Sequence, residues 1–265
     1  MDIKGKVVAI TGGASGIGKA VGNLMIRKGA DKVFIADVTE NILNETAEEI
    51  GAIPVVCDVS NEDDVKALVE EVKRHSSRID IFMSNAGIYI EGDENTSNQE
   101  WMNNWSIHVM AHVYAARAVV PHMINQGDGY LINTSSAAGL LTHIDSATYS
   151  TTKHAAIGFA EYLSINYASK GIKVSVLCPQ AVRTAMTSGR EDSVASVDGM
   201  LEPDFLAEVV LKSVDNEDFL ILPHPEVLTY MQRKTSNYER WLAGMRRFKK
   251  RRESKPRSCR PVILG

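Results

Sequence analysis

The chain of 265 residues lacks several features, and each absence excludes a class of protein. No apolar run approaches the ~18 residues that a membrane-spanning helix needs, and the first residues hold only the four-residue run VVAI, too short for a signal peptide. The three cysteines, Cys57, Cys178 and Cys259, are far apart and odd in number, and they show no metal-ligand spacing. We therefore expect free thiols in a reducing cytoplasm.

Two further chemistries lack their motifs. The seven histidines include no pattern of zinc ligands, so no metal is expected. The Gly-x-Ser-x-Gly turn that carries the nucleophile of α/β-hydrolases is missing as well. Neither metal-assisted chemistry nor a hydrolase nucleophile is predicted.

Positive charge is scarce outside one segment. The chain carries a net charge of −4, but residues 246–260 hold nine Lys and Arg against one Glu. The rest carries 20 Lys and Arg against 32 Asp and Glu, so the body is acidic and makes a poor surface for nucleic acid. Three interpretations of the basic tail stay open: a solvated helix end, a subunit contact, or attraction to an anionic membrane or nucleic acid.

Short apolar runs alternate with longer stretches of helical period. The predicted strands are 6–11, 32–37, 54–58, 79–85, 129–135, 173–179 and 219–222. The predicted helices between them are 16–28, 39–50, 61–75, 98–125, 147–169 and 204–214. Alternation of this kind is typical of βαβ units, and strands that are apolar on both faces indicate a sheet covered on both sides. We expect an α/β fold with a single doubly wound parallel sheet, Rossmann-like and flanked by helices.

Residues 11–18, with the sequence TGGASGIG, lie between the first predicted strand and the first predicted helix. Glycines there let the backbone approach a pyrophosphate, and the helix start offers free N–H groups and the positive end of its dipole. The spacing G-x3-G-x-G differs from the common G-x-G-x-x-G fingerprint, but the physics is shared. The segment predicts a nucleotide loop that contacts the cofactor through Gly12, Ser15, Gly16, Ile17 and Gly18.

Asp37 ends the second predicted strand, 19 residues after Gly18. This matches the ~20-residue spacing of the acid that binds the adenosine ribose hydroxyls in dinucleotide-binding folds. A carboxylate there repels the 2′-phosphate of NADP, and the next residue, Val38, supplies no compensating cation. Both features predict NAD as the cofactor.

Five motifs in this order resemble the short-chain dehydrogenase/reductase family. They are the TGGASGIG loop, the Asp58-Val59 pair after the third strand, the N-A-G at 85–87, Ser136 with the Y-x3-K of Tyr149 and Lys153, and CPQAVRT at 178–184. The resemblance runs from about residue 3 to about residue 225 and implies an oxidoreductase that forms homodimers or homotetramers through its two long central helices. It also implies cofactor contacts from Val38, Asp58, Val59, Asn85, Ala86, Gly87, Tyr149, Lys153, Pro179, Val182 and Thr184.

Tyr149 and Lys153 lie four residues apart on a predicted helix and so share a face. A free tyrosine titrates at about pH 10, and a nearby ammonium stabilises the phenolate, so Lys153 is expected to lower the pKa of Tyr149. Tyr149 then acts as acid/base for the carbinol proton, and the Ser136 hydroxyl binds the substrate oxygen. The hydride passes between the substrate carbon and the nicotinamide. The resemblance implies that Lys153 also holds the nicotinamide ribose.

The chain departs from the family pattern at Gln180, where the family usually has glycine, and at His108, where it usually has a helix asparagine. That asparagine takes part in a proton relay through its main-chain carbonyl, so a histidine can replace it. We expect a buried, neutral His108 that takes part in the catalytic site as a hydrogen-bond partner, its pKa lowered by burial and by Lys153. The alternative is a plain helix residue that points away from the site.

Residues 226–265 extend past the usual end of the fold. Residues 226–250 are predicted to form one more helix, with an apolar stripe at three- and four-residue steps. The stripe consists of Leu228, Met231, Tyr238, Trp241, Leu242, Met245 and Phe248. We therefore divide the chain into an NAD-binding catalytic domain at 1–225 and an appended helix and basic tail at 226–265, packed on the same subunit or on a neighbour.

The substrate pocket is expected between the catalytic residues and a mobile, incomplete lid at residues 185–203. Its predicted members are Tyr89, Ser136, His143, Tyr149, Gln180, Met186, residues 137–141 and Met200. Because most are apolar, they favour a hydrophobic or aromatic secondary alcohol over a sugar or a phosphorylated compound. The sequence thus predicts an NAD-dependent alcohol dehydrogenase or ketone reductase. The alternative is a non-catalytic NAD(H)-binding sensor, which the intact catalytic residues oppose.

Overall fold

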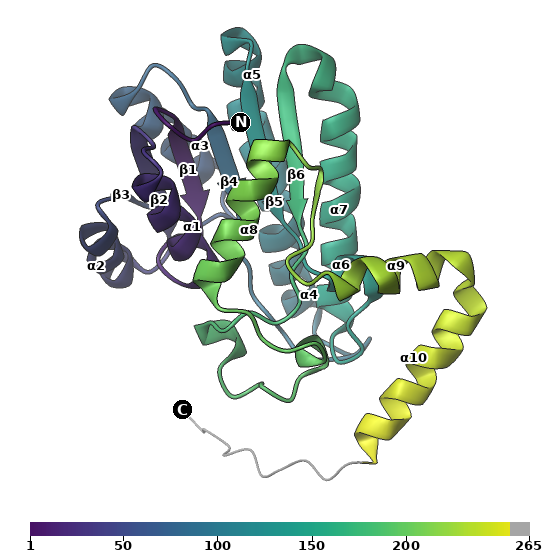
Figure 1. Ribbon diagram of the computed structural model, residues 1–265. Coiled ribbons are helices and arrows are strands. Elements are labelled where there is room, and N and C mark those ends of the chain that lie inside the picture. Colours follow the sequence, from purple (N-terminus) through teal and green to yellow (C-terminus); the bar gives the residue numbers. More distant parts are fainter. Residues whose placement is uncertain (255–265) are drawn as a thin grey trace.

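A seven-stranded parallel sheet forms the centre of the computed structural model, which describes residues 1–254 (Figure 1). The strand order is β3-β2-β1-β4-β5-β6-β7. The strands are β1 (Val7–Thr11), β2 (Lys32–Asp37), β3 (Ile53–Val56), β4 (Ile81–Ser84), β5 (Gly129–Thr134), β6 (Ile172–Leu177) and β7 (Leu220–Ile221). The predicted doubly wound fold is confirmed, and each predicted strand end lies within two residues of the observed one.

Helices cover both faces of the sheet, which is why β1, β4 and β5 are buried along their whole length. One apolar cluster joins the sheet to α1 (Gly16–Arg27), α2 (Glu40–Ile50) and α8 (Pro203–Asn216). A second cluster on the other face joins it to α3 (Glu62–His75), α5 (Ala111–Gln126) and α7 (Ala147–Tyr167). The strand order reverses between β1 and β4, so the segments that follow these two strands meet at one edge of the sheet.

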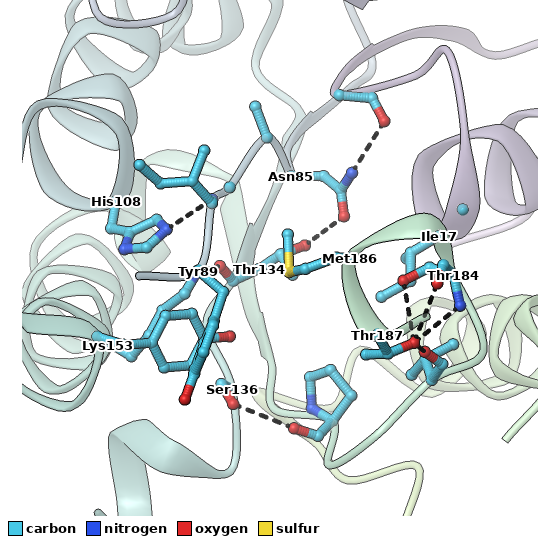
Figure 2. A pocket seen from close by; sticks show the side chains of 18 of the residues that line it. Ile17, Asn85, Tyr89, His108, Thr134, Ser136, Lys153, Thr184, Met186 and Thr187 are labelled. Carbon is cyan, nitrogen blue, oxygen red and sulfur yellow. Dashed lines mark hydrogen bonds between the residues drawn. The ribbon is translucent and has the colours of Figure 1, made fainter. Parts of the chain in front are cut away.

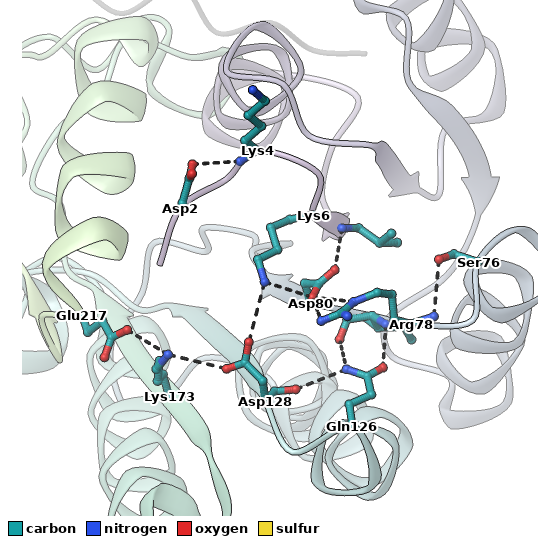
Figure 3. Close-up of polar contacts among 12 residues, drawn as sticks. Asp2, Lys4, Lys6, Ser76, Arg78, Asp80, Gln126, Asp128, Lys173 and Glu217 are labelled. Carbon is teal, nitrogen blue, oxygen red and sulfur yellow. Dashed lines mark hydrogen bonds and ion pairs between the residues drawn. The ribbon is translucent and has the colours of Figure 1, made fainter.

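The amino ends of the strands carry a separate polar cluster around Asp80, whose side chain is fully buried (Figure 3). Its carboxylate accepts hydrogen bonds from the backbone N–H of Val7 at 2.8 Å and from the guanidinium of Arg78 at 2.5 Å. The Lys6 ammonium lies 3.4 Å away and also pairs with Asp128. A buried carboxylate needs such partners, and the cluster therefore closes the end of the sheet opposite the nucleotide loop.

The predicted helix at 98–125 is interrupted. It consists of α4 (Asn98–Trp105), a π-helical turn at Ser106–Met110 that contains His108, and α5. In the π turn the N–H of Ala111 bonds to the carbonyl of Ser106, five residues earlier. Such turns insert one extra residue and often occur at functional sites. An apolar period cannot reveal a single inserted residue, so the sequence predicted one continuous helix.

The predicted helical extension at 226–250 is present, but it consists of two helices instead of one. Two helices, α9 (Glu226–Ser236) and α10 (Tyr238–Glu253), extend from the body as a bent arm (Figure 1). Asn237 breaks the run because its side chain accepts a hydrogen bond from the N–H of Arg240 at 2.9 Å and caps α10. Leu228 is 44% exposed, so it does not belong to a buried stripe, and no residue within Tyr238–Glu253 is buried.

Truncation after Pro225 is expected to lower the melting temperature by about 5 °C or more. Val227 is fully buried beside Ala137 and Leu141, and the Lys234 ammonium donates to the carbonyl of Leu140 at 2.6 Å. Burial of one such side chain contributes about 1.5–3 kcal/mol, and each kcal/mol corresponds to roughly 2–4 °C at this chain length. Calorimetry and light scattering check this. Truncation after Lys250 is the control, and equal melting temperatures and equal numbers of subunits for both variants would contradict the packing.

Several expectations fall on the end of the chain. Cys259 and the basic residues from 255 onward lie outside the described residues. Cys57 and Cys178 are buried and unpaired. Within residues 1–254, no helix combines the length and the apolar character that a membrane crossing requires.

Candidate active site

A cleft of about 350 Å³ opens at the carboxyl ends of the strands (Figure 2). It gathers segments that follow β1, β2, β3, β4, β5 and β6, as expected for a doubly wound sheet. The predicted site residues that line it are Gly12, Ser15, Gly16, Ile17, Asp37, Val38, Asp58, Val59, Asn85, Ala86, Gly87, Tyr89, His108, Ser136, His143, Tyr149, Lys153, Pro179, Gln180, Val182, Thr184 and Met186. Gly18, Met200 and residues 137–141 are not among its lining residues.

The glycine positions of the loop have no room for a side chain. Gly12 and Gly16 have φ angles of 64° and 51°, which favour glycine. A Cβ on Gly12 would lie 2.8 Å from the backbone of Ala86, and one on Gly16 would lie 2.9 Å from Thr184. A Cβ on Gly18 would overlap the carbonyl oxygen of Gly12, so Gly18 lets the helix pack on the loop and does not face the cleft. The resulting cradle at a helix start fits a pyrophosphate.

Asp37 lies at the other side of this cradle. Its carboxylate accepts hydrogen bonds from the backbone N–H groups of Ala14 and Thr39, both at 3.3 Å, which hold it at the end of β2. Val38 beside it is 65% exposed. The cations among the described lining residues are Lys153, Arg190 and Arg252, and they belong to α7, the lid and α10, not to the segment beside Asp37. The cradle and Asp37 together fit a dinucleotide with a free 2′-hydroxyl.

Ser136, Tyr149 and Lys153 meet in the cleft although they come from two elements. The buried Lys153 ammonium donates to the carbonyl of Thr134 at 3.0 Å and lies 5.6 Å from the centre of the Tyr149 ring. The Ser136 hydroxyl donates to the carbonyl of Pro179 at 3.3 Å, and its side chain also bonds to Tyr149. Figure 2 shows Lys153 and Ser136 in the same part of the cleft. This constellation can hold a substrate oxygen and exchange its proton.

The pKa values depart from one expectation. Burial lowers the pKa of Lys153 to about 8. Burial also raises the pKa of Tyr149, and the hydrogen bond with Ser136 only partly offsets this. In the protein without a bound cofactor, Lys153 therefore does not lower the pKa of Tyr149 as expected, because burial disfavours the phenolate. A positively charged nicotinamide ring beside Tyr149 would favour the phenolate again.

His108 points into the cleft, so the alternative in which it points away is wrong. Its Nε2 accepts a hydrogen bond from the N–H of Ile88 at 3.0 Å, and its Nδ1 donates to the hydroxyl of Thr152 at 2.9 Å. The ring is nearly perpendicular to that of Tyr149, at a centroid distance of 5.4 Å. Burial, and secondly the charge of Lys153, lower the pKa of His108 well below its ordinary value. The imidazole is neutral and connects the segment after β4 to α7.

His108→Asn is expected to keep kcat within ~10-fold, a barrier change under about 1.4 kcal/mol. Asparagine retains one donor and one acceptor for Ile88 and Thr152, whereas His108→Ala leaves both without their partner and should slow the reaction more. Steady-state kinetics of both variants over a range of pH check this. A folded His108→Asn protein that binds NADH but has no activity would show that the imidazole itself carries protons.

His112 is buried next to this site, and both ring nitrogens lack a hydrogen-bond partner among residues 1–254. Burial, followed by the charge of Lys153, lowers the pKa of His112 from 6.5 to about 3. Between these values the unfolded chain binds a proton that the folded protein does not. The stability present above pH 6.5 is therefore lost as the pH falls, by about 1.4 kcal/mol per pH unit.

His112→Leu is expected to remove about one proton from this pH dependence of stability. Denaturant unfolding from roughly pH 7 to roughly pH 5 measures the slope. His75→Leu, at an exposed position, is the control. Equal slopes in His112→Leu and the parent protein would contradict the buried neutral state of His112.

The substrate end of the cleft is partly aromatic. The Tyr89 ring lies edge-on to the rings of His143 and Tyr149, with both centroid distances 5.3 Å. The Arg190 guanidinium lies 4.4 Å from the centre of the Tyr89 ring. Burial is the main cause of a lowered pKa of His143. The catalytic tyrosine thus has neutral rings on one side.

Hydrogen bonds restrain the lid at residues 185–203, which the sequence predicted to be mobile. Gln180 donates from Nε2 to Asp198 at 2.9 Å, and Asp198 also accepts from the hydroxyl of Tyr230 on α9 at 2.9 Å. The N–H of Gln180 donates to His224 at 3.2 Å. These bonds join the segment after β6, the lid and α9. They restrain the lid, and the prediction of a mobile lid could not take them into account because they connect distant parts of the chain.

Sequence reasoning missed several residues of the site. Thr134 holds the Lys153 ammonium, and the Ser135 hydroxyl donates to the carbonyl of Lys153 at 2.8 Å. Their position at the end of β5 was a usable signal, because ligands gather at carboxyl ends of parallel strands. Arg190 and Ile88 carry no sequence signal, since their roles depend on contacts with distant segments.

Comparisons with known proteins agree with this geometry. A family model described as short chain dehydrogenase matches residues 6–195. Epidermal retinol dehydrogenase 2 from Homo sapiens is 30% identical over 240 residues, covering 87% of this chain and 77% of the relative. Short chain aldehyde dehydrogenase 1 from Euphorbia lathyris is 34% identical over 229 residues, covering 80% and 79%.

A solved structure supports the same conclusion. The short chain dehydrogenase/reductase from Burkholderia phymatum, crystallised in complex with NAD, has a TM-score of 0.84 and 27% identity, over 90% of this chain and 96% of that chain. The parallel sheet and the glycine cradle define a dinucleotide-binding oxidoreductase fold. The chain belongs to the short chain dehydrogenase family.

Proposed function

We propose that this protein is an NAD-dependent oxidoreductase that interconverts a hydrophobic secondary alcohol and its ketone. The observation that carries the proposal is a single cleft with Ser136, Tyr149 and Lys153 at one end and the glycine cradle with Asp37 at the other. A dinucleotide spanning these ends brings its nicotinamide to the catalytic residues. The NAD-bound relative supports this choice of cofactor.

Each catalytic side chain has a role that its contacts support. The Ser136 hydroxyl binds and orients the substrate oxygen, and Tyr149 takes the carbinol proton during oxidation or returns it during reduction. Lys153, held by Thr134, places its ammonium 5.6 Å from the centre of the Tyr149 ring, where it would favour the phenolate together with a bound, positively charged nicotinamide. Bound NAD supplies the hydride acceptor. His108 keeps the segment after β4 in place beside this group.

Turnover of cyclic, aromatic and steroidal secondary alcohols with NAD, followed by NADH absorbance, tests the proposal. We expect oxidation of at least one class, and a large loss of kcat in Ser136→Ala. Ser188→Ala, at an exposed position of the lid outside the cleft lining, removes the same hydroxyl and is the matched control. NADH binding without turnover of any alcohol or ketone would favour the alternative of an NAD(H)-binding sensor.

We further propose a homodimer or homotetramer formed through α4, α5 and α7. Apolar side chains on the outer face of α7 support this, since Tyr162 is 55% exposed and Ile165 is 80% exposed. Ile165→Glu should lower the mass measured by light scattering.

We place the protein in the cytoplasm, because the buried thiols of Cys57 and Cys178 suit a reducing compartment.

A further inference from the structure

A second cleft of about 270 Å³ adjoins the catalytic one. Both clefts are lined by Ser136, His143, Gln180 and Ala195, so they meet at the catalytic serine. The second cleft continues between α6 (Ala138–Leu141) and the arm formed by α9 and α10. The arm therefore extends the region that a substrate reaches from Ser136.

Most residues that line this second cleft are apolar. Its apolar side chains are Ala137, Ala138, Leu141, Val194, Ala195, Val197, Trp241, Met245 and Phe248. No carboxylate is among the described residues that line it, and its Arg233 is exposed. Such a surface gains free energy by covering apolar groups, and it holds fewer polar groups for a sugar or a phosphate than apolar ones for a hydrocarbon.

We propose that the second cleft binds the apolar body of the substrate, whose reacting carbon lies at Ser136. This deepens the proposed function and rests on it. The substrate is then a secondary alcohol or ketone that carries an extended alkyl chain or fused rings. Residues of α10 become specificity-determining residues, although α10 lies about a hundred residues after Ser136 in the chain.

One polar atom marks the junction of the two clefts. The Oε1 atom of Gln180 is buried and has no hydrogen-bond partner in the part of the chain that the structure describes. Its Nε2 is occupied by Asp198, which fixes the orientation of the amide. A single acceptor next to Ser136 suits a substrate with its polar groups at one end and an apolar remainder.

The alternative to a substrate is a second copy of the chain that covers the apolar residues of α10 in this cleft. Continuity argues for the substrate, since four residues line both clefts and one of them is Ser136. A partner chain seated there would cover the region beside the catalytic serine. The lid residues Val194 and Val197 also line the cleft, which a substrate-binding role explains.

Binding of a series of ketones to the NADH-loaded protein tests the proposal without requiring turnover. The probes are 2-butanone, 2-pentanone, 2-octanone and 2-undecanone, and calorimetry measures their affinities. We expect binding to tighten about threefold to fourfold for each added methylene until the cleft is filled. An affinity that does not change with chain length would overturn the proposal.

Met245→Asp places a charge in the second cleft and should weaken binding of 2-undecanone by ~30-fold or more, with little effect on 2-butanone. Leu242→Asp, an exposed position on the same helix outside the cleft, is the matched control. The affinity for NADH and the melting temperature should be unchanged in both variants. Equal ketone affinities in the two variants would overturn the proposal. It would also be overturned if Met245→Asp had a lower mass in solution while its ketone affinities kept the same dependence on chain length.

The experiment distinguishes an error in the proposed reaction from an error in the proposed apolar site. Tyr149→Phe should bind the ketone series with the same dependence on length and reduce none of it. If the parent protein also binds the series but reduces no ketone, the reaction is wrong and the apolar site stands. If the parent protein reduces ketones with no dependence on length, the reaction stands and the apolar site is wrong.

Discussion

Tyr149→Phe is expected to lower kcat/KM by about 10³-fold or more, equivalent to about 4 kcal/mol of transition-state stabilisation. In the proposed reaction the phenol exchanges the carbinol proton, and Ser136 and Lys153 cannot replace it. Ser136 is bonded to the carbonyl of Pro179, and the buried Lys153 ammonium is bonded to the carbonyl of Thr134. Steady-state kinetics with NAD and the best alcohol measure the effect.

The structural consequences of this substitution should be small. Phenylalanine keeps the ring that packs edge-on against Tyr89 and His108, so NADH affinity and the melting temperature should match the parent protein. Tyr162→Phe, on the exposed face of the same helix, is the control and should keep full activity. A Tyr149→Phe protein that retains activity within tenfold would refute the role of Tyr149 as acid/base.

The second large effect concerns Asp37. We expect kcat/KM with NAD to exceed that with NADP by at least ~100-fold, about 2.7 kcal/mol. Backbone N–H groups of Ala14 and Thr39 hold the carboxylate at the cleft, where we expect it to accept hydrogen bonds from ribose hydroxyls and to repel a 2′-phosphate. The double variant Asp37→Ser with Val38→Arg should narrow the difference, because it replaces the negative charge with a positive one.

Glu40→Ser provides the control for this experiment. Glu40 begins α2 close to Asp37 in the chain, and its side chain is not part of the cleft. Loss of this nearby charge should leave the preference for NAD unchanged. Comparable use of NAD and NADP by the parent protein would refute the assignment of Asp37.

Local sequence determined most of the fold and the cofactor end of the site. Apolar runs such as β1 specify strands buried on both faces, and the glycines of the loop specify a backbone that only they adopt readily. The spacing from Gly18 to Asp37 places an acid at the end of β2 because the helix between them has a fixed length. These signals depend on neighbours in the chain, so they are readable without the structure. Gly18 itself packs the loop and does not face the cleft.

Tertiary structure decided the features that depend on distant contacts. The neutral state of His108 follows from its burial between Ile88 and Thr152, which are 20 and 44 residues away in the chain. The raised pKa of Tyr149 likewise follows from burial, which no spacing predicts. The bent arm arises because one asparagine cap outweighs a continuous apolar period. The sequence by itself determined the strands, the nucleotide loop and the candidate catalytic residues. Folding decided the protonation of those residues and the second cleft, because burial and long-range packing exist only in the folded chain.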